Sequence, residues 1–403
     1  MQEKKLRILM MIHRQADNSP YCFYVHEQAK ALAARGHEVI VISCVGVIPM
    51  MKRFRPKQAE VAARTPKEDV IDGIRVFYPR CLTLGNAGEK YIGGRLLAAA
   101  ALPIAKRLHK EKPFDIVHAH MLPRDGHAGL LVARALGIPF ALTVHGTDIF
   151  HYFIPGREPW ARNVMIAGEA DALMAVSSLL MSRVTPYRGE EKISRIVPNG
   201  VDLSLVPDET TNTPRTVISV GTLKARKCMD RTLEAFARLA DEFKDATLTI
   251  VGIGEMEGQL RSRIEELGLE GRVMLTGGLE HEEVLRRMAQ SDLFVLPSWG
   301  EGYGIVYIEA MAAGCISVGA EKEGIEDTIT DGENGFLVPA GDIDAVERVM
   351  RRVFEDRDAH AALRARGRED ARALTWARNA ASVESIYLKL LDSGRKEHEQ
   401  TRH

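Results

Sequence analysis

The stretch Leu296–Met311, LPSWGEGYGIVYIEAM, limits the fold more narrowly than any other part of the sequence. An apolar run ends at Pro297, a segment containing Gly300, Gly302 and Gly304 follows, and an apolar segment comes next. This order predicts a strand, a glycine-rich loop and a helix. Glycine lets a backbone come close to a ligand, and the N–H groups at a helix N-terminus favour an anion such as a diphosphate. The alternative is a tight turn that binds nothing.

Strand-like apolar runs alternate with helix-like segments through the rest of the chain, which predicts parallel sheets covered by helices on both faces. In the first half we expect strands at Ile8–Ile12, Val39–Ser43, Arg75–Tyr78, Asp115–His118, Phe140–Val144, Ala172–Val176 and Ser194–Val197, with helices at Val25–Ala34, Arg95–His109 and Gly126–Leu136. In the second half we expect strands at Thr216–Val220, Thr247–Val251, Val273–Thr276, Leu293–Pro297 and Ile316–Val318, with helices at Asp230–Asp241, Glu255–Leu267, Glu282–Ala289, Val306–Ala313 and Ile343–Glu355.

The fold class is therefore α/β, with two doubly wound, Rossmann-like domains facing a central cleft. The polar segment Ser204–Pro214, which contains two prolines, is the expected linker. We place the N-terminal domain at residues 1–205 and the C-terminal domain at residues 214–377. Ligands of such sheets bind beyond the carboxyl ends of the strands, so the cleft is the expected site.

Composition favours an ordinary soluble protein, since 45% of the 403 residues are hydrophobic and 27% are charged. The five cysteines are scattered without metal-ligand spacing, which argues for a reducing compartment. The first apolar run, Leu6–Ile12, is too short for a secretion signal, and no run approaches the ~18 apolar residues of a membrane span. We therefore expect a cytoplasmic protein.

The two halves of the chain differ in charge. Residues 1–200 hold 28 Lys and Arg against 18 Asp and Glu, and residues 201–403 hold 26 against 37. Basic residues gather in Met50–Lys57 and around the apolar segment Tyr91–Lys110, at Arg95, Lys106, Arg107 and Lys110. One interpretation is peripheral contact with an anionic membrane surface at the inner face of the cell membrane. The other is an ordinary solvated helix and a chance asymmetry.

Glu301 and Glu309, separated by seven residues, resemble the E-x7-E signature of the retaining GT-B glycosyltransferases of family 4. The resemblance covers nearly the whole chain and continues in segments 196–204, 218–241, 251–260, 272–284 and 330–342. Segment 375–391 is similar to the closing helix of that family, so we expect residues of about 378–403 to pack back on the first domain.

The resemblance implies a role for each matching residue. Glu309 would bind the ribose, Glu301 the transferred sugar, and Lys227 the diphosphate of a leaving nucleotide, while His145 would face the donor sugar. Catalytic roles would thus fall to His145, Glu301 and Lys227. Further donor contacts would come from Gly302, Tyr303, Gly304, Ile305, Arg226, Gly221, Thr222, Gly252, Thr276 and Gly277, chiefly through the amides of Tyr303 and Gly304 for the sugar and phosphates.

This chain departs from the family pattern near the expected phosphates. Thr222 follows Gly221 where the family usually has arginine, and Cys228 follows Lys227 where it has glycine. Arg226 or Lys224 would then be the substitute cation. In the first loop, residues 16–39, Cys22 and its neighbours replace an expected glycine.

A metal cluster of His118, His120, Asp125 and His127 is a weak alternative, because the spacing is not a clean ligand pattern. We expect no metal and no cofactor, and we expect Asp148 to hold its loop rather than to act as a base. The nucleotide sugar would be a substrate, with UDP the commonest nucleotide of the family.

The resemblance implies transfer of a sugar to a glycan, lipid-linked or small-molecule acceptor, with an α-glycosidic product formed in cell-envelope or exopolysaccharide biosynthesis. No nucleic-acid partner is expected. Two other classes remain open: a non-catalytic sugar-nucleotide-binding subunit, and an NAD-dependent or epimerase-type enzyme of similar architecture. The last is disfavoured because the turn HRQADNSP after the first strand contains no glycine.

Overall fold

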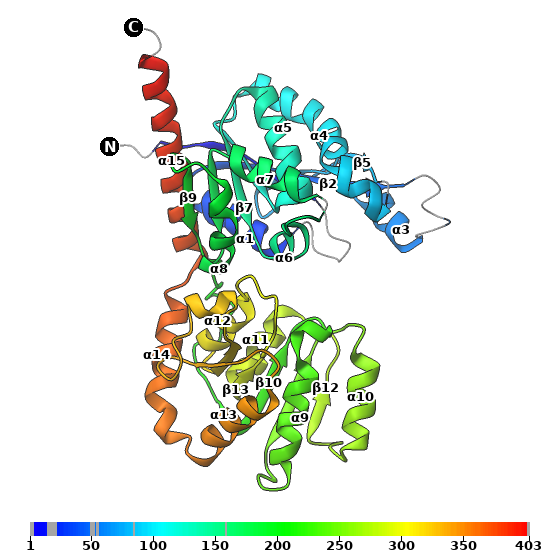
Figure 1. The fold of residues 1–403 in the computed structure, drawn as a ribbon, viewed down its shortest axis with the longest axis vertical. Helices are drawn as coiled ribbons and strands as arrows, with labels where there is room; N and C mark the ends of the chain where they lie inside the picture. The colour runs from blue at the N-terminus through cyan, green and yellow to red at the C-terminus, as the bar shows by residue number, and fades with distance from the viewer. Residues whose placement is uncertain are drawn as a thin grey trace. The chain divides into compact units, whose positions relative to one another are not determined.

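The computed structural model describes residues 4–13, 22–48, 53, 56–83, 85–157 and 159–400, with the side chains of 56–58, 85–91 and 394–400 left out. The chain divides into two compact units (Figure 1). The first comprises Met1–Pro198 and Trp376–His403, and the second comprises Asn199–Thr375.

The first unit is built on a mainly parallel sheet with strand order β3-β4-β2-β1-β6-β7-β8-β9, and β5 pairs with β2. The strands are β1 (Arg7–His13), β2 (Glu38–Val47), β3 (Glu68–Ile71), β4 (Ile74–Phe77), β5 (Arg80–Leu82), β6 (Ile116–His120), β7 (Phe140–Val144), β8 (Ala172–Ala175) and β9 (Ile193–Ile196). Only the β3–β4 pair is antiparallel among the described strand pairs. The inner strands β6, β7 and β8 are completely buried, as their continuous apolar sequences predict.

Helices surround this sheet. They are α1 (Phe23–Ala34), α3 (Pro56–Arg64), α4 (Gly85–Glu111), α5 (His127–Leu136), α6 (Thr147–Tyr152), α7 (Trp160–Glu169), α8 (Ser178–Val184) and the C-terminal α15 (Trp376–Gln400). α15 lies against α1, where Gln28 Nε2 donates to Asn379 Oδ1 at 2.9 Å. Val383 and Tyr387 of α15 belong to the same apolar core as β1.

The second unit has six parallel strands in the order β12-β11-β10-β13-β14-β15. They are β10 (Thr213–Val220), β11 (Thr247–Val251), β12 (Val273–Leu275), β13 (Ser291–Val295), β14 (Ile316–Ala320) and β15 (Phe336–Val338). The helices are α9 (Met229–Ala240), α10 (Glu257–Glu266), α11 (His281–Gln290), α12 (Ile305–Ala312), α13 (Ile343–Glu355) and α14 (Ala361–Arg372). From β10 the chain adds β11 and β12 on one side, and it then returns to add β13, β14 and β15 on the other side of β10. The switch point between β10 and β13 is where such sheets bind ligands.

All of the strands predicted from the sequence are present, with ends that move by a few residues. The strand expected at Leu293–Pro297 is Ser291–Val295, and α4 begins at Gly85, ten residues before the expected Arg95. β10 begins at Thr213, within the segment expected to be a linker. Several elements were not predicted from the sequence. They are the short strands β3, β5 and β15, the helices α3, α6, α7 and α8, and α14, whose arginine-rich sequence carries a weak apolar pattern.

Candidate functional site

Two loops meet at the switch point of the second unit. The loop after β10 carries Arg226 and Lys227, and the loop after β13 carries Trp299 and Glu301. The backbone N–H of Trp299 donates to the carbonyl of Arg226 at 2.9 Å, which fixes one loop against the other. Residues 73 positions apart in the sequence thus lie together at the carboxyl edge of the sheet.

Glu301 lies between two cations. Its Oε2 contacts Nζ of Lys227 in an ion pair and lies 3.7 Å from Nη1 of Arg226. The side chains of Lys227 and Glu301 are only 10% and 14% exposed, so solvent screens their interaction little. Two cations therefore converge on one carboxylate oxygen, and they could pair with an incoming diphosphate instead.

Glu323 holds the Glu301 loop and was missed by the sequence analysis. Its carboxylate accepts the backbone N–H groups of Gly300 at 2.9 Å and Glu301 at 2.7 Å. Burial raises the pKa of Glu323 above its usual value, and the two amides oppose that rise. The N–H of Gly324 also donates to the carbonyl of Glu301 at 3.0 Å. The shape of this loop therefore depends on a segment 22 residues further along the chain.

Gly304 starts α12 in a conformation that favours glycine. Its φ is +83°, and a Cβ at this position would lie 2.5 Å from the ring of Tyr307. No side chain of the described residues caps α12, so its first N–H groups point beyond the helix end. Tyr303 is buried, and burial raises its phenol pKa to about 12, so only its backbone is available to a ligand. Gly302 and Ile305 flank this turn.

Glu309 lies in the second turn of α12 and is buried. Oε1 of Glu309 and Nε2 of His281 form a hydrogen bond of 2.8 Å. His281 begins α11 and was not singled out from the sequence, because no local pattern connects it to Glu309. The contact fixes one oxygen of the carboxylate that was expected to bind ribose.

Three glycines lie side by side along the carboxyl edges of β10, β11 and β12. The N–H of Gly221 donates to the Val251 carbonyl at 3.0 Å, and the N–H of Gly252 donates to the Gly277 carbonyl at 2.9 Å. A Cβ on Gly252 would lie 1.9 Å from the Gly221 carbonyl oxygen, so only glycine fits there. Thr276 Oγ1 donates to the Gly277 carbonyl at 2.9 Å. This edge therefore presents backbone rather than side chains.

The structure explains why the family has glycine at the position that Cys228 occupies in this chain. Cys228 has φ +53° and ψ 32°, a left-handed conformation that glycine adopts without strain and cysteine does not. Its thiol is buried, and burial raises the thiol pKa to about 11. Lys227 still contacts Glu301, so the substitution does not displace that lysine. Thr222 and Lys224 are exposed, whereas Arg226 faces Glu301.

In the first unit, His145 follows β7, is half-buried, and packs against the buried His120. Its Nε2 lies 3.1 Å from Nδ1 of His120, and its ring centroid lies 4.2 Å from that of Tyr24. Burial lowers the pKa of His145 well below its usual range and that of His120 to about 3. Both rings are therefore neutral at pH 7. His145 Nδ1 and His120 Nε2 have no hydrogen-bond partner among the described residues.

Asp148 holds the His145 loop, as expected. Its carboxylate accepts the N–H groups of His145 at 3.1 Å, Gly146 at 2.8 Å and Leu122 at 3.1 Å. Burial raises the pKa of Asp148, while these three amides lower it.

The other candidate metal ligands have separate partners. His118 bonds to Thr143 Oγ1 at 2.7 Å and to the hydroxyl of Tyr387 at 2.6 Å, and Asp125 pairs with His13 at 2.5 Å. Within the described ranges, no group of three His, Cys, Asp or Glu side chains is placed to hold a metal ion.

Some expectations fall outside the part of the chain that the structure describes. They concern most of Met50–Lys57 and residues 16–21 of the first loop. In the described part, none of the helices is long and apolar enough to cross a membrane.

Comparisons with known proteins cover nearly the whole chain. Residues 23–205 match the family model for Glycosyltransferase Family 4, and residues 206–370 match that for Glycosyl transferases group 1. Glycogen synthase of Mycobacterium tuberculosis is 26% identical, covering 91% of this chain and 90% of its own length. D-inositol 3-phosphate glycosyltransferase of Xylanimonas cellulosilytica is also 26% identical, covering 90% of both proteins.

Solved structures show the same fold. Sucrose-phosphate synthase from Thermosynechococcus elongatus superimposes with a TM-score of 0.77 at 19% identity, covering 96% of this chain and 100% of that one. Anabaena HepE in complex with UDP and glucose gives a TM-score of 0.68 at 18% identity, covering 94% and 99%. With the two adjoining family matches and the shared GT-B fold, the chain belongs to glycosyltransferase family 4, and it is a retaining glycosyltransferase that uses nucleotide-sugar donors.

Proposed function

We propose that this enzyme transfers a sugar from a UDP-sugar to a glycan, lipid-linked or small-molecule acceptor and forms an α-glycosidic bond. Cell-envelope or exopolysaccharide biosynthesis is the proposed setting. The observation that carries the donor assignment is the cluster of Lys227, Arg226 and Glu301 beside the N-terminus of α12. UDP is favoured because Anabaena HepE and the pneumococcal O-GlcNAc transferase are both described in complex with it.

In this proposal the diphosphate replaces Glu301 as the partner of Lys227. The two cations then stabilise the charge that develops on the leaving nucleotide, which is where a fixed cation lowers a barrier most. Of the two substitutes suggested for the missing arginine, Arg226 is favoured over Lys224 because it already faces Glu301. Glu301, once released, accepts hydrogen bonds from hydroxyls of the transferred sugar.

The ribose is assigned to Glu309. His281 orients this carboxylate through one oxygen, and the other oxygen accepts from a ribose hydroxyl. The glycine edge formed by Gly221, Gly252 and Gly277 lets the nucleotide approach the backbone closely. The second unit, Asn199–Thr375, is thus the proposed donor domain.

His145 is assigned to the donor sugar. Because its ring is neutral at pH 7, His145 forms a hydrogen bond with a sugar hydroxyl rather than supplying a positive charge. The ring of His120, 3.1 Å away, fixes its orientation. The proton of the acceptor hydroxyl passes to the departing phosphate, and the anomeric configuration is retained. The first unit is the proposed acceptor domain.

We also propose that the enzyme is cytoplasmic and contacts an anionic membrane surface. Arg95, Lys106, Arg107 and Lys110 are exposed on α4. The apolar face of α4, which includes Leu97 and Leu108, is buried within the unit. Any such contact would therefore be electrostatic, and flotation with anionic but not neutral liposomes, lost at high salt, is the expected result. Equal, negligible flotation with both liposomes would refute it.

The main experiment is a thermal-shift screen of nucleotide sugars, followed by NMR of the product anomer. UDP-sugars should raise the melting temperature, and a Glu309→Ala variant should lose this shift and donor hydrolysis. A fold that no UDP-sugar stabilises would overturn the choice of UDP. A non-catalytic binding subunit would show the shift, but wild type and Glu309→Ala would have the same background turnover.

A further inference from the structure

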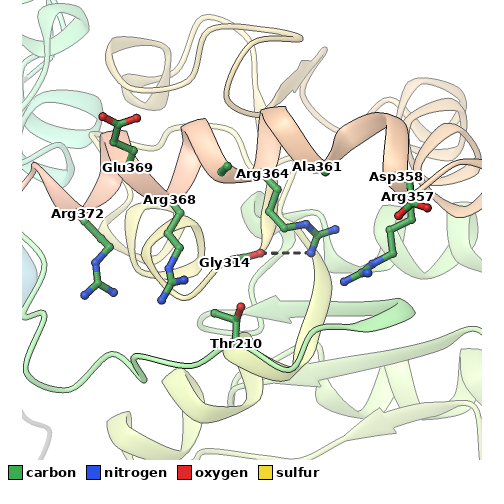
Figure 2. Close-up of a pocket in the computed structure, with 10 residues that line it drawn as sticks. Thr210, Gly314, Arg357, Asp358, Ala361, Arg364, Arg368, Glu369 and Arg372 are labelled. Carbon is green, nitrogen blue, oxygen red and sulfur yellow. Dashed lines mark hydrogen bonds between the residues drawn. The ribbon is translucent and has the colours of Figure 1, made fainter.

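A second pocket lies in the second unit, away from the candidate donor site. It is an open pocket of about 630 Å³ between α14 and a wall that includes Thr210 and Gly314 (Figure 2). Thr210 precedes β10 and Gly314 precedes β14, so the pocket lies at the amino ends of these strands. The donor-site residues follow the carboxyl ends, and a five-residue strand such as β14 spans roughly 16 Å. The two sites therefore lie at opposite edges of one sheet.

Four arginines line this pocket: Arg357, Arg364, Arg368 and Arg372. The last three are four residues apart, which places them on one face of α14 with about 6 Å of helix between neighbours. Figure 2 shows their side chains extending from the helix toward Thr210, while Glu369 points from the opposite side. The pocket therefore presents a row of guanidinium groups.

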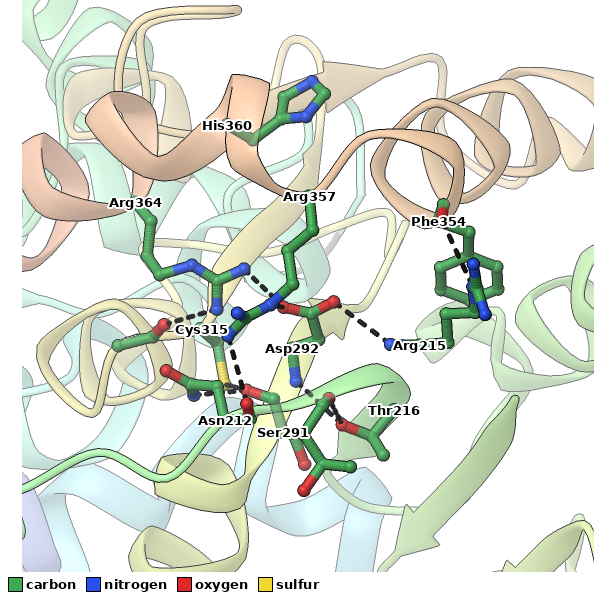
Figure 3. Close-up of polar contacts among 12 residues, drawn as sticks. Asn212, Arg215, Thr216, Ser291, Asp292, Cys315, Phe354, Arg357, His360 and Arg364 are labelled. Atoms are coloured by element: carbon green, nitrogen blue, oxygen red, sulfur yellow. Dashed lines mark hydrogen bonds and ion pairs between the residues drawn. The ribbon is translucent and has the colours of Figure 1, made fainter. Parts of the chain in front are cut away.

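Two of the arginines have a structural role. Arg357 and Arg364 both pair with Asp292, whose side chain is 0% exposed, and the Arg357 contact measures 3.0 Å (Figure 3). A buried carboxylate needs such partners, since leaving it unpaired is costly. Arg364 also donates to the Gly314 carbonyl at 3.4 Å. Asp292 balances one of these two positive charges and holds both side chains in place.

Arg368 and Arg372 are not neutralised in this way. In the described part of the chain, Arg368 donates to the carbonyls of Ala312 at 3.3 Å and Asp208 at 2.6 Å, which carry no net charge. Arg372 pairs with Asp208 at 3.5 Å, but the side chain of Asp208 is 94% exposed, so the pair is weak. Nη1 of Arg372 is buried and lacks a hydrogen-bond partner among the described residues. A buried, unsatisfied charged donor is destabilising unless an acceptor meets it.

We propose that this pocket binds a small phosphate ester, whose phosphoryl oxygens accept hydrogen bonds from Arg368 and Arg372. Guanidinium groups match phosphate geometry with paired donors, and two of them about 6 Å apart can approach one phosphoryl group from both sides. The volume lies in the usual range for small-molecule sites and exceeds that of inorganic phosphate alone, which leaves room for an organic group.

Inorganic phosphate is the first probe, titrated calorimetrically into the full-length enzyme against chloride at equal ionic strength. Arg368→Gln with Arg372→Gln should weaken binding by about tenfold or more, since two charge-assisted contacts are removed. Arg366→Gln is the matched control, because Arg366 is on α14 but is 64% exposed and pairs with Asp370. It should bind as the wild type does.

Phosphate could also bind the cations of the donor site, so a Lys227→Ala variant separates the two sites. The pocket assignment expects phosphate binding to persist in Lys227→Ala and to disappear when the two glutamines are added. Equal phosphate affinity in Lys227→Ala with and without the two glutamines would overturn it, whatever the outcome for the donor site.

If the double variant does not fold, Thr210→Glu gives an independent test, because it places a carboxylate on the opposite wall and keeps every arginine. The same loss of affinity is expected, and unchanged binding by folded Thr210→Glu would overturn the proposal.

Discussion

Replacing Lys227 by alanine tests the proposed chemistry most directly. The substitution removes one of two cations beside Glu301 and leaves Arg226, 3.7 Å away, as the remaining cation. The net charge of this cluster falls by one, just where the nucleotide diphosphate is expected to leave. Lys227 is 10% exposed, so its field at the phosphate is only partly screened.

The magnitude follows from that burial. Two unit charges 4 Å apart interact by about 4 kcal/mol at an effective dielectric constant of 20, which is an upper bound of roughly 10³-fold in rate. Loss of one fixed transition-state donor typically costs about 10²–10³ in kcat. We therefore expect kcat for donor hydrolysis to fall by about 10²-fold or more in Lys227→Ala, with a smaller change in KM.

The assay is steady-state release of the nucleotide, with Lys224→Ala as the matched control. Lys224 is in the same loop but is exposed, so its removal should change kcat by no more than about twofold. A kcat in Lys227→Ala within about fivefold of the wild type would refute the leaving-group role. A rise in KM alone would show that the lysine only binds the donor.

Three other substitutions give sharp expectations. In Gly304→Ala the new Cβ would collide with Tyr307 at a left-handed position. The substitution should therefore lower the free energy of unfolding by about 1–3 kcal/mol in urea titrations and abolish the donor-induced thermal shift. A normal thermal shift would contradict the role of this turn. Burial lowers the pKa of His120 to about 3, so its contribution to stability is present above pH 6.5 and is lost as the pH falls toward 3. His120→Gln should therefore reduce the slope of unfolding free energy against pH by about 1.4 kcal/mol per unit between pH 4 and 6, whereas exposed His151→Gln should not; equal slopes would argue against a buried neutral His120. Cys228→Gly should change the free energy of unfolding by less than about 1 kcal/mol, because relief of the left-handed strain offsets the greater backbone entropy of glycine in the unfolded chain. Cys228→Val should lower the free energy of unfolding by about 2 kcal/mol. Equal melting temperatures of the two variants would disprove the strain.

The sequence by itself determined the layered α/β architecture. Inner strands such as Phe140–Val144 are continuous apolar runs, and both of their faces are buried. The local sequence pattern is therefore enough to predict a sheet covered by helices on both faces. The turn at Gly304 was also visible, because the requirement for glycine is local. The spacing of Glu301 and Glu309 around this turn predicts the donor site that we propose.

Other features depended on the tertiary structure. The Lys227–Glu301 pair spans 74 residues and the His281–Glu309 pair spans 28, so no local pattern could connect their members. Glu323 was missed for the same reason. His120 was considered only as a metal ligand, and the sequence did not connect it to His145. The arginine row of α14 was not recognised in the sequence, and only the fold placed it against Thr210 and the buried Asp292. Periodicity determines which face of an element is buried, but strand order determines which side chains meet, and strand order is a property of the whole sheet.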